Sequence, residues 1–374
     1  MDFDYVIVGA GFSGAVCAER LANGHGKKVL IVERRRHIGG NAFDELDENG
    51  ILIHRYGPHI FHTKLPEVWA YLSRFTAWRP YHHRVLGMVD GALVPLPFNL
   101  TSLNSLFPAS LAARLDEKLV GTFGFGARVP ILDMKKEKDA DLRLLADFVY
   151  QKVFLTYTKK QWGLPPEELA ASVTARVPVV VSKDDRYFND PWQGIPAHGY
   201  TKVFERLLDS PRIKCLLNTD YKEVAADLKP RRLVYTGMVD ALFDYRYGRL
   251  TYRSLEFRHK NVARDSYQPV ATVNYPMDYD YTRVTEYRKL TGQEASSTTV
   301  TYEYPRAYEK EGDEAYYPIP LDSNAVMHER YKTEARGLAN VHFVGRLAQY
   351  AYLNMDQVVS AALHAVEELE GPAS

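Results

Sequence analysis

The chain has 374 residues, which is enough for two or three domains with a large core. Its 47 basic and 47 acidic residues cancel, so net charge gives no reason to expect a nucleic acid or an anionic membrane as partner. No apolar stretch is long enough to span a membrane, no signal peptide precedes the first predicted strand, and the two cysteines, Cys17 and Cys215, suit a reducing compartment. We therefore expect a cytoplasmic protein that is not inserted in a membrane.

The amino-terminal sequence predicts a strand, a helix and a second strand. Residues 4–8 form an apolar run of strand length, residues 15–21 have the pattern of a helix, and residues 28–32 form another apolar strand. The first strand and the helix are joined by the sequence G-x-G-x-x-G at residues 9–14. This arrangement is typical of a Rossmann-like dinucleotide-binding domain.

The glycines and the acid that follow the two strands each have a physical role. Gly9 permits a tight turn, Gly11 lets the backbone approach a pyrophosphate, and Gly14 allows the helix to pack closely on the strand. The N–H groups at the start of the helix then face the phosphates. Glu33 lies nineteen residues after Gly14, where an acid accepts hydrogen bonds from ribose hydroxyls. The sequence therefore predicts a bound dinucleotide.

Later segments favour FAD over NAD as that dinucleotide. Residues 34–41 combine a basic stretch with a Gly-Gly pair, which resembles flavoproteins of the glutathione reductase-like group. Residues 233–237 predict a short strand that ends in Thr-Gly, and residues 341–346 predict a strand that ends in Gly-Arg. The helical pattern of residues 355–369 would bring a helix amino terminus back to the flavin.

The predicted fold class is α/β, with a Rossmann-like domain interrupted by mixed α+β insertions. The cofactor segments open and close the chain, so any other domain must be inserted between them. Apolar residues recur every three or four positions in the first insertion and alternate in the later ones. The predicted domains are an FAD-binding domain (1–80, 198–240 and 336–374), a helical domain (98–170) and an antiparallel sheet domain (81–97, 171–197 and 241–335).

Several short strings occur in an order that is specific to one flavoenzyme family. They include residues 55–63 (RYGPHIFHT), 157–163 (YTKKQWG), 243–246 (FDYR), 316–318 (YYP) and 352–355 (YLNM). In these strings, and over essentially the whole chain, the sequence resembles the UDP-galactopyranose mutases, in particular the shorter prokaryotic ones. The resemblance implies an FAD-dependent isomerase that interconverts UDP-galactopyranose and UDP-galactofuranose. It also implies a homodimer whose product supplies galactofuranose for cell-surface glycans.

The same resemblance implies an unusual use of the flavin. In this family, the N5 atom of reduced FAD attacks the anomeric carbon of the sugar and UDP leaves. The sugar ring opens through a flavin iminium adduct and recloses through a different hydroxyl, so that no net redox change occurs. Positive charge beside the diphosphate stabilises the leaving UDP.

Residue roles carried over from the family fall into three sets, and no metal ligand is among them. The implied catalytic residues are Arg176, Arg346, His62 and Arg283. The implied substrate-binding residues are Phe154, Tyr157, Trp162, Arg176, Tyr187, Phe188, Arg283, Tyr317, Arg346, Tyr352 and Asn354. The implied cofactor-binding residues are Gly9, Gly11, Phe12, Ser13, Gly14, Glu33, Arg34, Gly40, Asn41, His59, Ile60, Gly237, Gly345, Arg346, Tyr352, Asn354 and Met355.

Physical chemistry supports some of these roles more than others. Arginine suits the diphosphate because it binds phosphate oxygens bidentately. Tyr157 and Trp162 offer flat faces to uracil, although from spacing alone ordinary packing at a helix end explains them better. Of the two histidines beside the isoalloxazine, His59 and His62, we favour His62 for a flavin-side role. Asn354 stands where many relatives have an acid, so we expect it to bind rather than to transfer protons.

Three other functions stay open at this stage. An amine-oxidase-like FAD oxidoreductase would share the cofactor fold but would not need Arg176 or Arg346. A flavin-binding or nucleotide-sugar-binding protein without catalysis would bind UDP and show no turnover. A mutase for another UDP-pyranose is the third, because the motifs specify UDP and flavin more firmly than the sugar.

Overall fold

The chain folds into two compact units, each built around its own core. The computed structural model describes residues 3–169, 177–228, 230–309, 312–319 and 321–371. The first unit comprises Met1–Tyr81, Asp190–Arg253 and Tyr308–Ser374, and the second comprises His82–Asn189 and Ser254–Ala307. Among the described residues, no helix is both long and apolar enough to cross a membrane.

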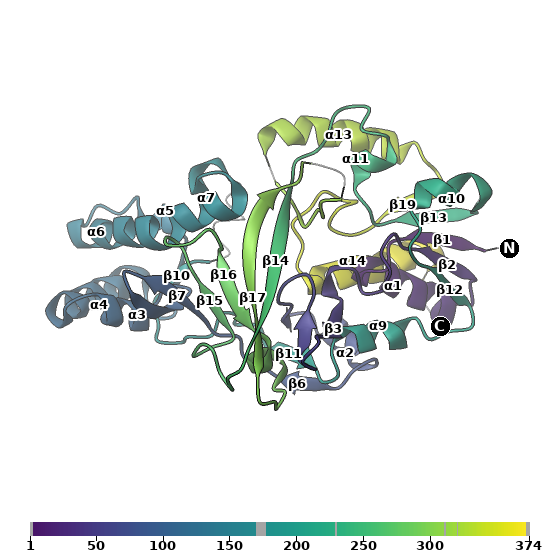
Figure 1. Cartoon of the computed structure of the whole chain (residues 1–374). Helices are drawn as coiled ribbons and strands as arrows, with labels where there is room; N and C mark the ends of the chain where they lie inside the picture. Colours follow the sequence, from purple (N-terminus) through teal and green to yellow (C-terminus); the bar gives the residue numbers. More distant parts are fainter. Residues whose placement is uncertain (1–2, 170–176, 229, 310–311, 320, 372–374) are drawn as a thin grey trace. The chain divides into compact units, whose positions relative to one another are not determined.

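The first unit is organised by a sheet of five parallel strands (Figure 1). The strands follow the order β12 (Ile213–Leu216), β2 (Val29–Val32), β1 (Tyr5–Val8), β13 (Arg232–Tyr235) and β19 (Val341–Phe343). Every neighbouring pair runs parallel, so the carboxyl ends of all five strands meet at one edge. This is the Rossmann-like α/β fold that the sequence predicts, and the prediction of the fold class is confirmed.

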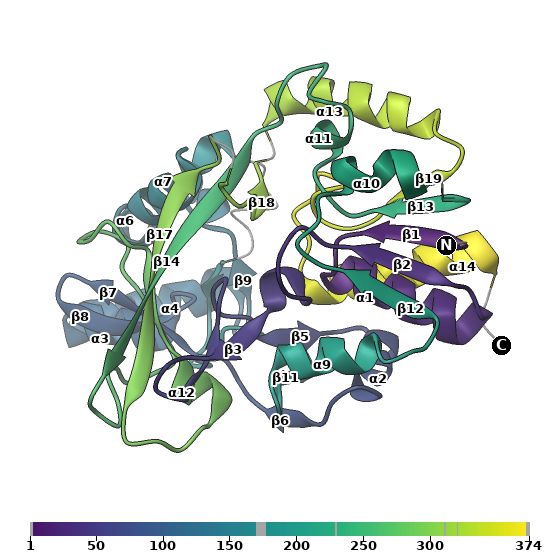
Figure 2. The same ribbon diagram turned by 45° about the vertical axis from the view of Figure 1, so that its right-hand side comes forward.

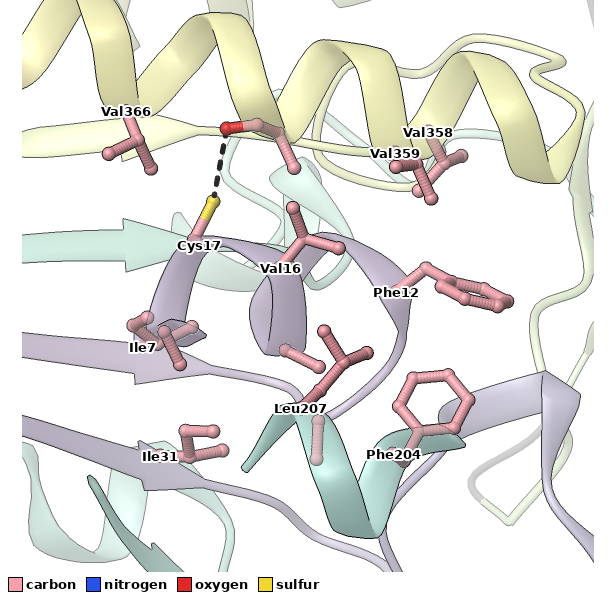
Figure 3. Close-up of a cluster of buried hydrophobic side chains, with 14 of the residues drawn as sticks. Ile7, Phe12, Val16, Cys17, Ile31, Phe204, Leu207, Val358, Val359 and Val366 are labelled. Atoms are coloured by element: carbon pink, nitrogen blue, oxygen red, sulfur yellow. Dashed lines mark hydrogen bonds between the residues drawn. The ribbon is translucent and has the colours of Figure 1, made fainter. Parts of the chain in front are cut away.

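Side chains that alternate along the strands give this sheet two apolar faces. On one face, Ile7 and Ile31 pack with α1 (Phe12–Glu19), α9 (Tyr200–Leu207) and α14 (Met355–Glu370). Figure 3 shows α1 between the other two helices, with the Cys17 thiol directed at the Ala362 carbonyl oxygen 3.8 Å away. Cys17 is therefore a buried packing residue of the core, as its position in the first helix predicts.

The opposite face of the sheet is covered by α10 (Tyr221–Leu228), as Figure 2 shows. Val6, Leu30 and Leu233 are buried there, against partly buried apolar residues of the helix. Successive strand residues point to opposite faces, and both faces are buried here. Every position of β1 and β2 is therefore apolar, instead of every second one. Helices on both faces are what such runs require.

The rest of the first unit consists of short elements. Strand β11 (Trp192–Pro196) lies antiparallel between β5 (Phe61–Thr63) and β6 (Trp78–Pro80). Strands β3 (Asp44–Leu46) and β4 (Leu52–His54) form a hairpin. The other elements are η1 (Arg20–Gly24), η2 (Gly40–Ala42), α2 (Pro66–Ser73), α11 (Val239–Leu242), β18 (Tyr317–Pro318) and α13 (Asp322–Arg336).

The second unit contains a mixed sheet rather than a purely antiparallel one. Its strands follow the order β14 (Tyr252–Val262), β17 (Thr298–Ala307), β16 (Arg283–Glu286), β15 (Thr272–Asn274), β7 (Val85–Val89) and β8 (Ala92–Leu96). The first two residues of β14 belong to the first unit, where they pair with β18 (Tyr317–Pro318) at the edge of the same sheet. The pairs β17–β16, β16–β15 and β7–β8 are antiparallel, but β15 and β7 run parallel. The prediction of an antiparallel sheet is wrong at this pair, because β15 returns after a long crossover instead of a hairpin.

Helices of the second unit share one core with strands β7 and β8. On α6 (Ala140–Val149) the buried residues recur at helical spacing, and Asp139 caps its amino terminus. They meet Val85 and Leu96 of the strands in the same cluster. The other elements are α3 (Leu100–Leu106), α4 (Ala109–Phe123), β9 (Arg128–Val129), α5 (Ile131–Met134), η3 (Tyr150–Leu155), α7 (Thr156–Trp162), η4 (Pro166–Glu168), β10 (Val179–Val180) and α12 (Tyr287–Thr291).

This division differs from the three domains that the sequence suggests. The predicted helical domain (98–170) and the predicted sheet segment 81–97, from His82 onward, contribute to one core, so they belong to a single unit. Within the predicted sheet segment 171–197, the residues from Asp190 onward join the first unit because β11 pairs with β5 and β6.

Candidate functional site

A cavity of about 550 Å³ opens at the carboxyl ends of the parallel strands in the first unit. It is lined by residues that follow β1, β2 and β13, namely Gly9, Glu33 and Thr236, and by residues 219–222, which follow β12. Ligands of open α/β sheets bind at this edge, where the strand order reverses, and the volume lies in the usual range for ligand pockets. The cavity is therefore the place where a dinucleotide is expected.

Glycines at and beside the cavity are required by close backbone contacts and by a positive φ. A Cβ on Gly14 would lie 1.9 Å from the Gly9 carbonyl oxygen, and one on Gly40 would lie 2.8 Å from the Gly11 Cα. Gly9 has a φ of +99°, which only glycine adopts readily. Gly11 is the N-cap of α1 and supplies no side-chain hydrogen bond, so the first N–H groups of the helix are not capped by it. These features fit a pyrophosphate at the start of α1.

Glu33 is buried at the wall of the cavity, where both carboxylate oxygens accept backbone hydrogen bonds. Oε2 accepts from the Ala10 N–H at 2.8 Å, and Oε1 accepts from the Arg35 N–H at 2.8 Å. Each oxygen has a further lone pair that can accept a ribose hydroxyl. Glu33 thus fixes the turn that follows β1 while remaining able to bind a ribose.

Most of the predicted cofactor residues line this cavity, but some do not. The lining includes Gly9, Gly11, Phe12, Ser13, Glu33, Arg34, Gly40, Asn41, His59, Gly237, Arg346 and Met355. Gly14, Ile60, Gly345, Tyr352 and Asn354 are not among the described lining residues. Gly345 lies next to the lining residue Ser13, since a Cβ on Gly345 would be 2.1 Å from the Ser13 hydroxyl oxygen.

The cavity also contains residues that the sequence did not suggest. Residues 219–222, Tyr245 and Arg249 all line it. A signal for the first group existed, because β12 is a parallel neighbour of β2 and its carboxyl end must reach the same edge. Tyr245 belongs to the family string at residues 243–246, but no cofactor role was assigned to it. The Arg249 guanidinium lies 3.9 Å from the centre of the Tyr245 ring.

His59 is a neutral histidine in the cavity wall. Its Nδ1 lies 2.8 Å from the Gly57 carbonyl oxygen, which can only accept, so Nδ1 carries the proton and Nε2 is an acceptor. Burial, with His54 and Arg346 adding to the effect, lowers the pKa of His59 to about 3. The backbone N–H of His59 donates to His54 Nδ1 at 2.9 Å.

His62 is paired with an acid, and its flavin-side role stays a prediction. It lies on β5, and its Nδ1 forms a short hydrogen bond with Asp190, next to β11. Among the described residues, His59 lines the cavity and His62 does not. The strand pairing of β5 with β11 explains this contact, because it brings together residues 128 positions apart.

Arg346 follows β19 and lies between two tyrosines. Its Nη2 donates to the Leu353 carbonyl oxygen at 2.6 Å. The guanidinium carbon lies 5.3 Å from the ring centre of Tyr317 and 5.9 Å from that of Tyr352, and the two rings meet edge to face. The structure therefore brings together three of the residues that the resemblance assigns to substrate binding. A fixed guanidinium with two phenol groups is suited to binding phosphate oxygens.

Asn354 caps a helix. Its side chain accepts from the backbone at the third position of α14, and its own N–H donates to Gln357 Oε1 at 2.9 Å, which completes a capping box. This cap accounts for an asparagine at the start of α14. The contact of Asn354 with substrate or cofactor that the resemblance implies stays a prediction.

In the second unit, three polar residues form a chain. Arg283 Nη2 donates to the Tyr157 hydroxyl at 2.8 Å, and its Nε lies 3.4 Å from Glu303 Oε1. Burial raises the pKa of Tyr157 to about 12. Burial also raises the pKa of Glu303, which the charge of Arg283 opposes. Tyr157 therefore keeps its proton at neutral pH and can donate it to a ligand.

The remaining aromatic residues of the second unit differ in exposure. Phe154 and Trp162 are more than nine-tenths buried, and for Trp162 this agrees with the packing at a helix end that spacing alone suggests. Tyr187 and Phe188 are partly exposed and meet edge to face at 5.0 Å. His83 contacts both rings and was not identified from the sequence. Arg176 lies outside the described residues.

Comparison with known proteins identifies the family. The profile of the UDP-galactopyranose mutase family matches residues 152–352, and that of the NAD(P)-binding Rossmann-like domain matches residues 7–75. A probable UDP-galactopyranose mutase of Klebsiella pneumoniae is 38% identical, over 97% of this chain and 94% of its own length. The chain belongs to the UDP-galactopyranose mutase family. The resemblance that the sequence suggests is thereby confirmed.

A second relative and a solved structure are also similar to this chain over nearly its full length. A dTDP-fucopyranose mutase of Escherichia coli is 36% identical over 97% of both chains. The crystal structure of a reduced UDP-galactopyranose mutase has a TM-score of 0.73 and 16% identity, covering 99% of this chain and 94% of that one, which shows the same fold. Membership of this UDP-galactopyranose mutase family makes the protein an isomerase, and together with the Rossmann-like domain it indicates FAD as the cofactor.

Proposed function

We propose that the protein interconverts UDP-galactopyranose and UDP-galactofuranose, without net oxidation or reduction. The observation that carries this proposal is similarity to UDP-galactopyranose mutases over nearly the full chain, combined with a dinucleotide cavity beside an arginine between two tyrosines. An amine-oxidase-like activity needs no diphosphate-binding residues, so it accounts for less of the chain.

The cofactor supplies one part of the chemistry. When bound, reduced FAD provides the N5 nucleophile that lets the nucleotide leave and the sugar ring open and reclose. The residues around the cavity are suited to hold it: Glu33 for the ribose, the start of α1 for the pyrophosphate, and His59 at the wall. Since His59 stays neutral, its Nε2 can accept a hydrogen bond without adding a positive charge.

The chain's own side chains bind and orient the substrate. Arg346 stabilises the negative charge that develops on the nucleoside diphosphate as it leaves, and Tyr317 and Tyr352 donate hydrogen bonds to the phosphates. Arg176 would add a second positive charge on the same group. The hydroxyl of Tyr157, oriented by Arg283, donates to the substrate, while Tyr187 and Phe188 offer aromatic surface to the pyrimidine.

A second candidate is a mutase for a deoxythymidine nucleotide sugar. The relative from Escherichia coli, a dTDP-fucopyranose mutase, is almost as similar to this chain as the one from Klebsiella pneumoniae. Residues that bind flavin and diphosphate serve either substrate, so the pyrimidine and the sugar C6 decide between them. The two sugars differ by one hydroxyl at C6, and the two nucleotides differ by the methyl group of the pyrimidine and the 2′-hydroxyl of the ribose. A site built to bind a hydroxyl strongly rejects a substrate that lacks it.

The test is anaerobic turnover with defined substrates. The purified protein is reduced with dithionite, incubated separately with UDP-galactofuranose and with dTDP-fucofuranose, and the products are separated by chromatography. We expect conversion of UDP-galactofuranose to UDP-galactopyranose. Conversion of dTDP-fucofuranose alone would support the second candidate, and no conversion of either, with FAD bound and reduced, would contradict both.

The biological setting is a proposal of the same kind. The product would supply galactofuranose for cell-surface glycans, and the enzyme would act in the cytoplasm as a homodimer. Two cysteines, one of them buried in the core, suit a reducing compartment. Mass measurement in solution at micromolar concentration tests the dimer directly.

A further inference from the structure

The wall of the cofactor cavity includes a segment that is distant in sequence from the dinucleotide motif. Gly312, Asp313, Ala315 and Tyr316 line the cavity beside residues 34 and 35, which follow β2. Between Asp313 and Ala315 lies Glu314, whose carboxylate reaches this basic stretch across some 280 positions of sequence. Two parts of one wall are thus joined by a single side chain.

The contacts of Glu314 are charge-assisted and partly buried. Its Oε2 accepts from Arg35 Nη2 at 2.7 Å and its Oε1 accepts from Arg35 Nε at 3.3 Å, so Arg35 is bound through two of its nitrogens. Arg34 Nη2 forms a shorter bond with Oε2. The side chain of Arg35 is 13% exposed, that of Glu314 is 28% exposed and that of Arg34 is 49% exposed. The pair of Arg35 and Glu314 is therefore screened less than a surface pair, whereas the pair with the more exposed Arg34 is screened more.

The electrostatics agree with a permanently charged carboxylate. Burial alone would raise the pKa of Glu314, but its hydrogen bonds and charge interactions with Arg35 and Arg34 outweigh this and lower the pKa below its usual value. The two neighbouring guanidinium groups repel each other unless an anion lies between them. Glu314 is the carboxylate that the structure places there.

Arg35 also contacts other residues at or near the cavity wall. Its Nη2 also donates to Asn41 Oδ1 at 2.9 Å, and Asn41 itself lines the cavity. Its guanidinium lies 4.3 Å from the ring centre of Tyr56, which in turn contacts Tyr316. The position of Arg35 therefore affects cavity residues from two distant segments.

We propose that Glu314 is a positioning residue of the cofactor site, which holds Arg34 and Arg35 at the cavity wall and thereby slows the release of FAD. In this proposal FAD leaves when the segment around Glu314 and the stretch after β2, which both border the cavity, separate. The ion pairs oppose that separation. The inference concerns cofactor retention, so it does not depend on which nucleotide sugar the enzyme converts.

The test measures FAD release from the purified holoenzyme. Flavin fluorescence increases when FAD dissociates, and the rate of this increase is followed after the holoenzyme is diluted to a concentration at which released FAD does not rebind. We expect Glu314→Gln to release FAD about tenfold faster than the parent, because one partner of a charged, partly buried hydrogen-bond group is lost. Glu314→Asp, which retains the charge, should restore part of the difference.

Controls separate this role from general stability. Glu309 is an exposed acid in the same segment, so Glu309→Gln should release FAD at the parent rate. The melting temperature of the FAD-free proteins should be similar for all variants. Arg34→Gln and Glu314→Gln should have non-additive effects on the release rate when combined. An unchanged release rate in Glu314→Gln, or an equal acceleration in Glu309→Gln, would overturn the proposal.

Discussion

The Arg283 guanidinium donates to the Tyr157 hydroxyl at 2.8 Å, which joins strand β16 to helix α7 in the second unit. Arginine cannot accept a hydrogen bond, so the hydroxyl proton of Tyr157 remains available to another acceptor. Glu303, opposite Arg283 in the strand pairing, supports the guanidinium from the other side. Arg283 therefore fixes the position of the Tyr157 hydroxyl and leaves its proton free to be donated to a ligand.

Replacement of Tyr157 by phenylalanine tests whether that donor binds substrate. We expect Tyr157→Phe to lower kcat/KM about tenfold or more, since a hydrogen bond to a charged group contributes roughly 1.5–3 kcal/mol. The FAD content should stay unchanged because Tyr157 belongs to the second unit, whereas the dinucleotide cavity is in the first. Tyr279, which is 51% exposed, offers a matched control, and Tyr279→Phe should behave like the parent. Equal kinetics for Tyr157→Phe and the parent would remove Tyr157 from the substrate site.

The role of Arg346 predicts a loss of turnover with the cofactor retained. Arg346→Ala removes the charge beside Tyr317 and Tyr352, so we expect kcat to fall by about 100-fold or more while FAD content stays near that of the parent. Arg176→Ala should have a similar effect. The control is Arg330→Ala on α13, an exposed arginine that should be dispensable. Isolation of Arg346→Ala without FAD would point instead to a role in cofactor binding.

The dinucleotide site could be predicted from the sequence because its determinants are local. Gly9, Gly14 and Glu33 lie within 25 residues, and each is required by a turn or contact inside one strand–helix–strand unit. The pair of His62 and Asp190 could not, because it depends on antiparallel pairing across 128 positions. Contacts of that kind leave no local pattern.

Asn354 is an intermediate case. Its sequence context, Asn followed three residues later by Gln at the start of an apolar helix, is the signature of a capping box. The resemblance to the family implies that Asn354 binds a ligand, whereas the capping pattern predicts that it caps a helix.

The mixed sheet of the second unit could be predicted only in part. The alternation of apolar residues predicts that β15 and β7 are strands, but it does not predict that they run parallel.

The buried histidines predict a loss of stability in acid. Burial lowers the pKa of His54 to about 3, whereas an unfolded histidine titrates near 6.5. Between these values the unfolded chain binds more protons, so the contribution is complete above about pH 6.5 and is lost as pH falls toward 3. His54 alone adds a slope of about 1.4 kcal/mol per pH unit in that window.

Melting temperatures measured between pH 4 and pH 7 check this prediction. His54→Asn, which keeps an acceptor for the His59 N–H, should show a shallower decline with acid than the parent, even though it is less stable at pH 7. His198 is exposed, so His198→Asn should follow the parent curve. Parallel curves for the parent and His54→Asn would mean that His54 is not held neutral by the fold.

Two glycine-to-alanine changes should have opposite effects on stability. In Gly14→Ala the new Cβ would lie 1.9 Å from the Gly9 carbonyl oxygen and 3.2 Å from Ile7 Cγ2, so α1 must move away from β1. Since α1 presents its amino terminus to the cavity, we expect the protein to lose FAD and to melt at a lower temperature. Gly121 lies in α4 with no atom within 4 Å of an added Cβ, so Gly121→Ala should stabilise the protein by roughly 0.5–1 kcal/mol. Calorimetry with flavin quantification distinguishes the two, and full FAD occupancy in Gly14→Ala would show that the close approach of helix and strand is not needed for binding.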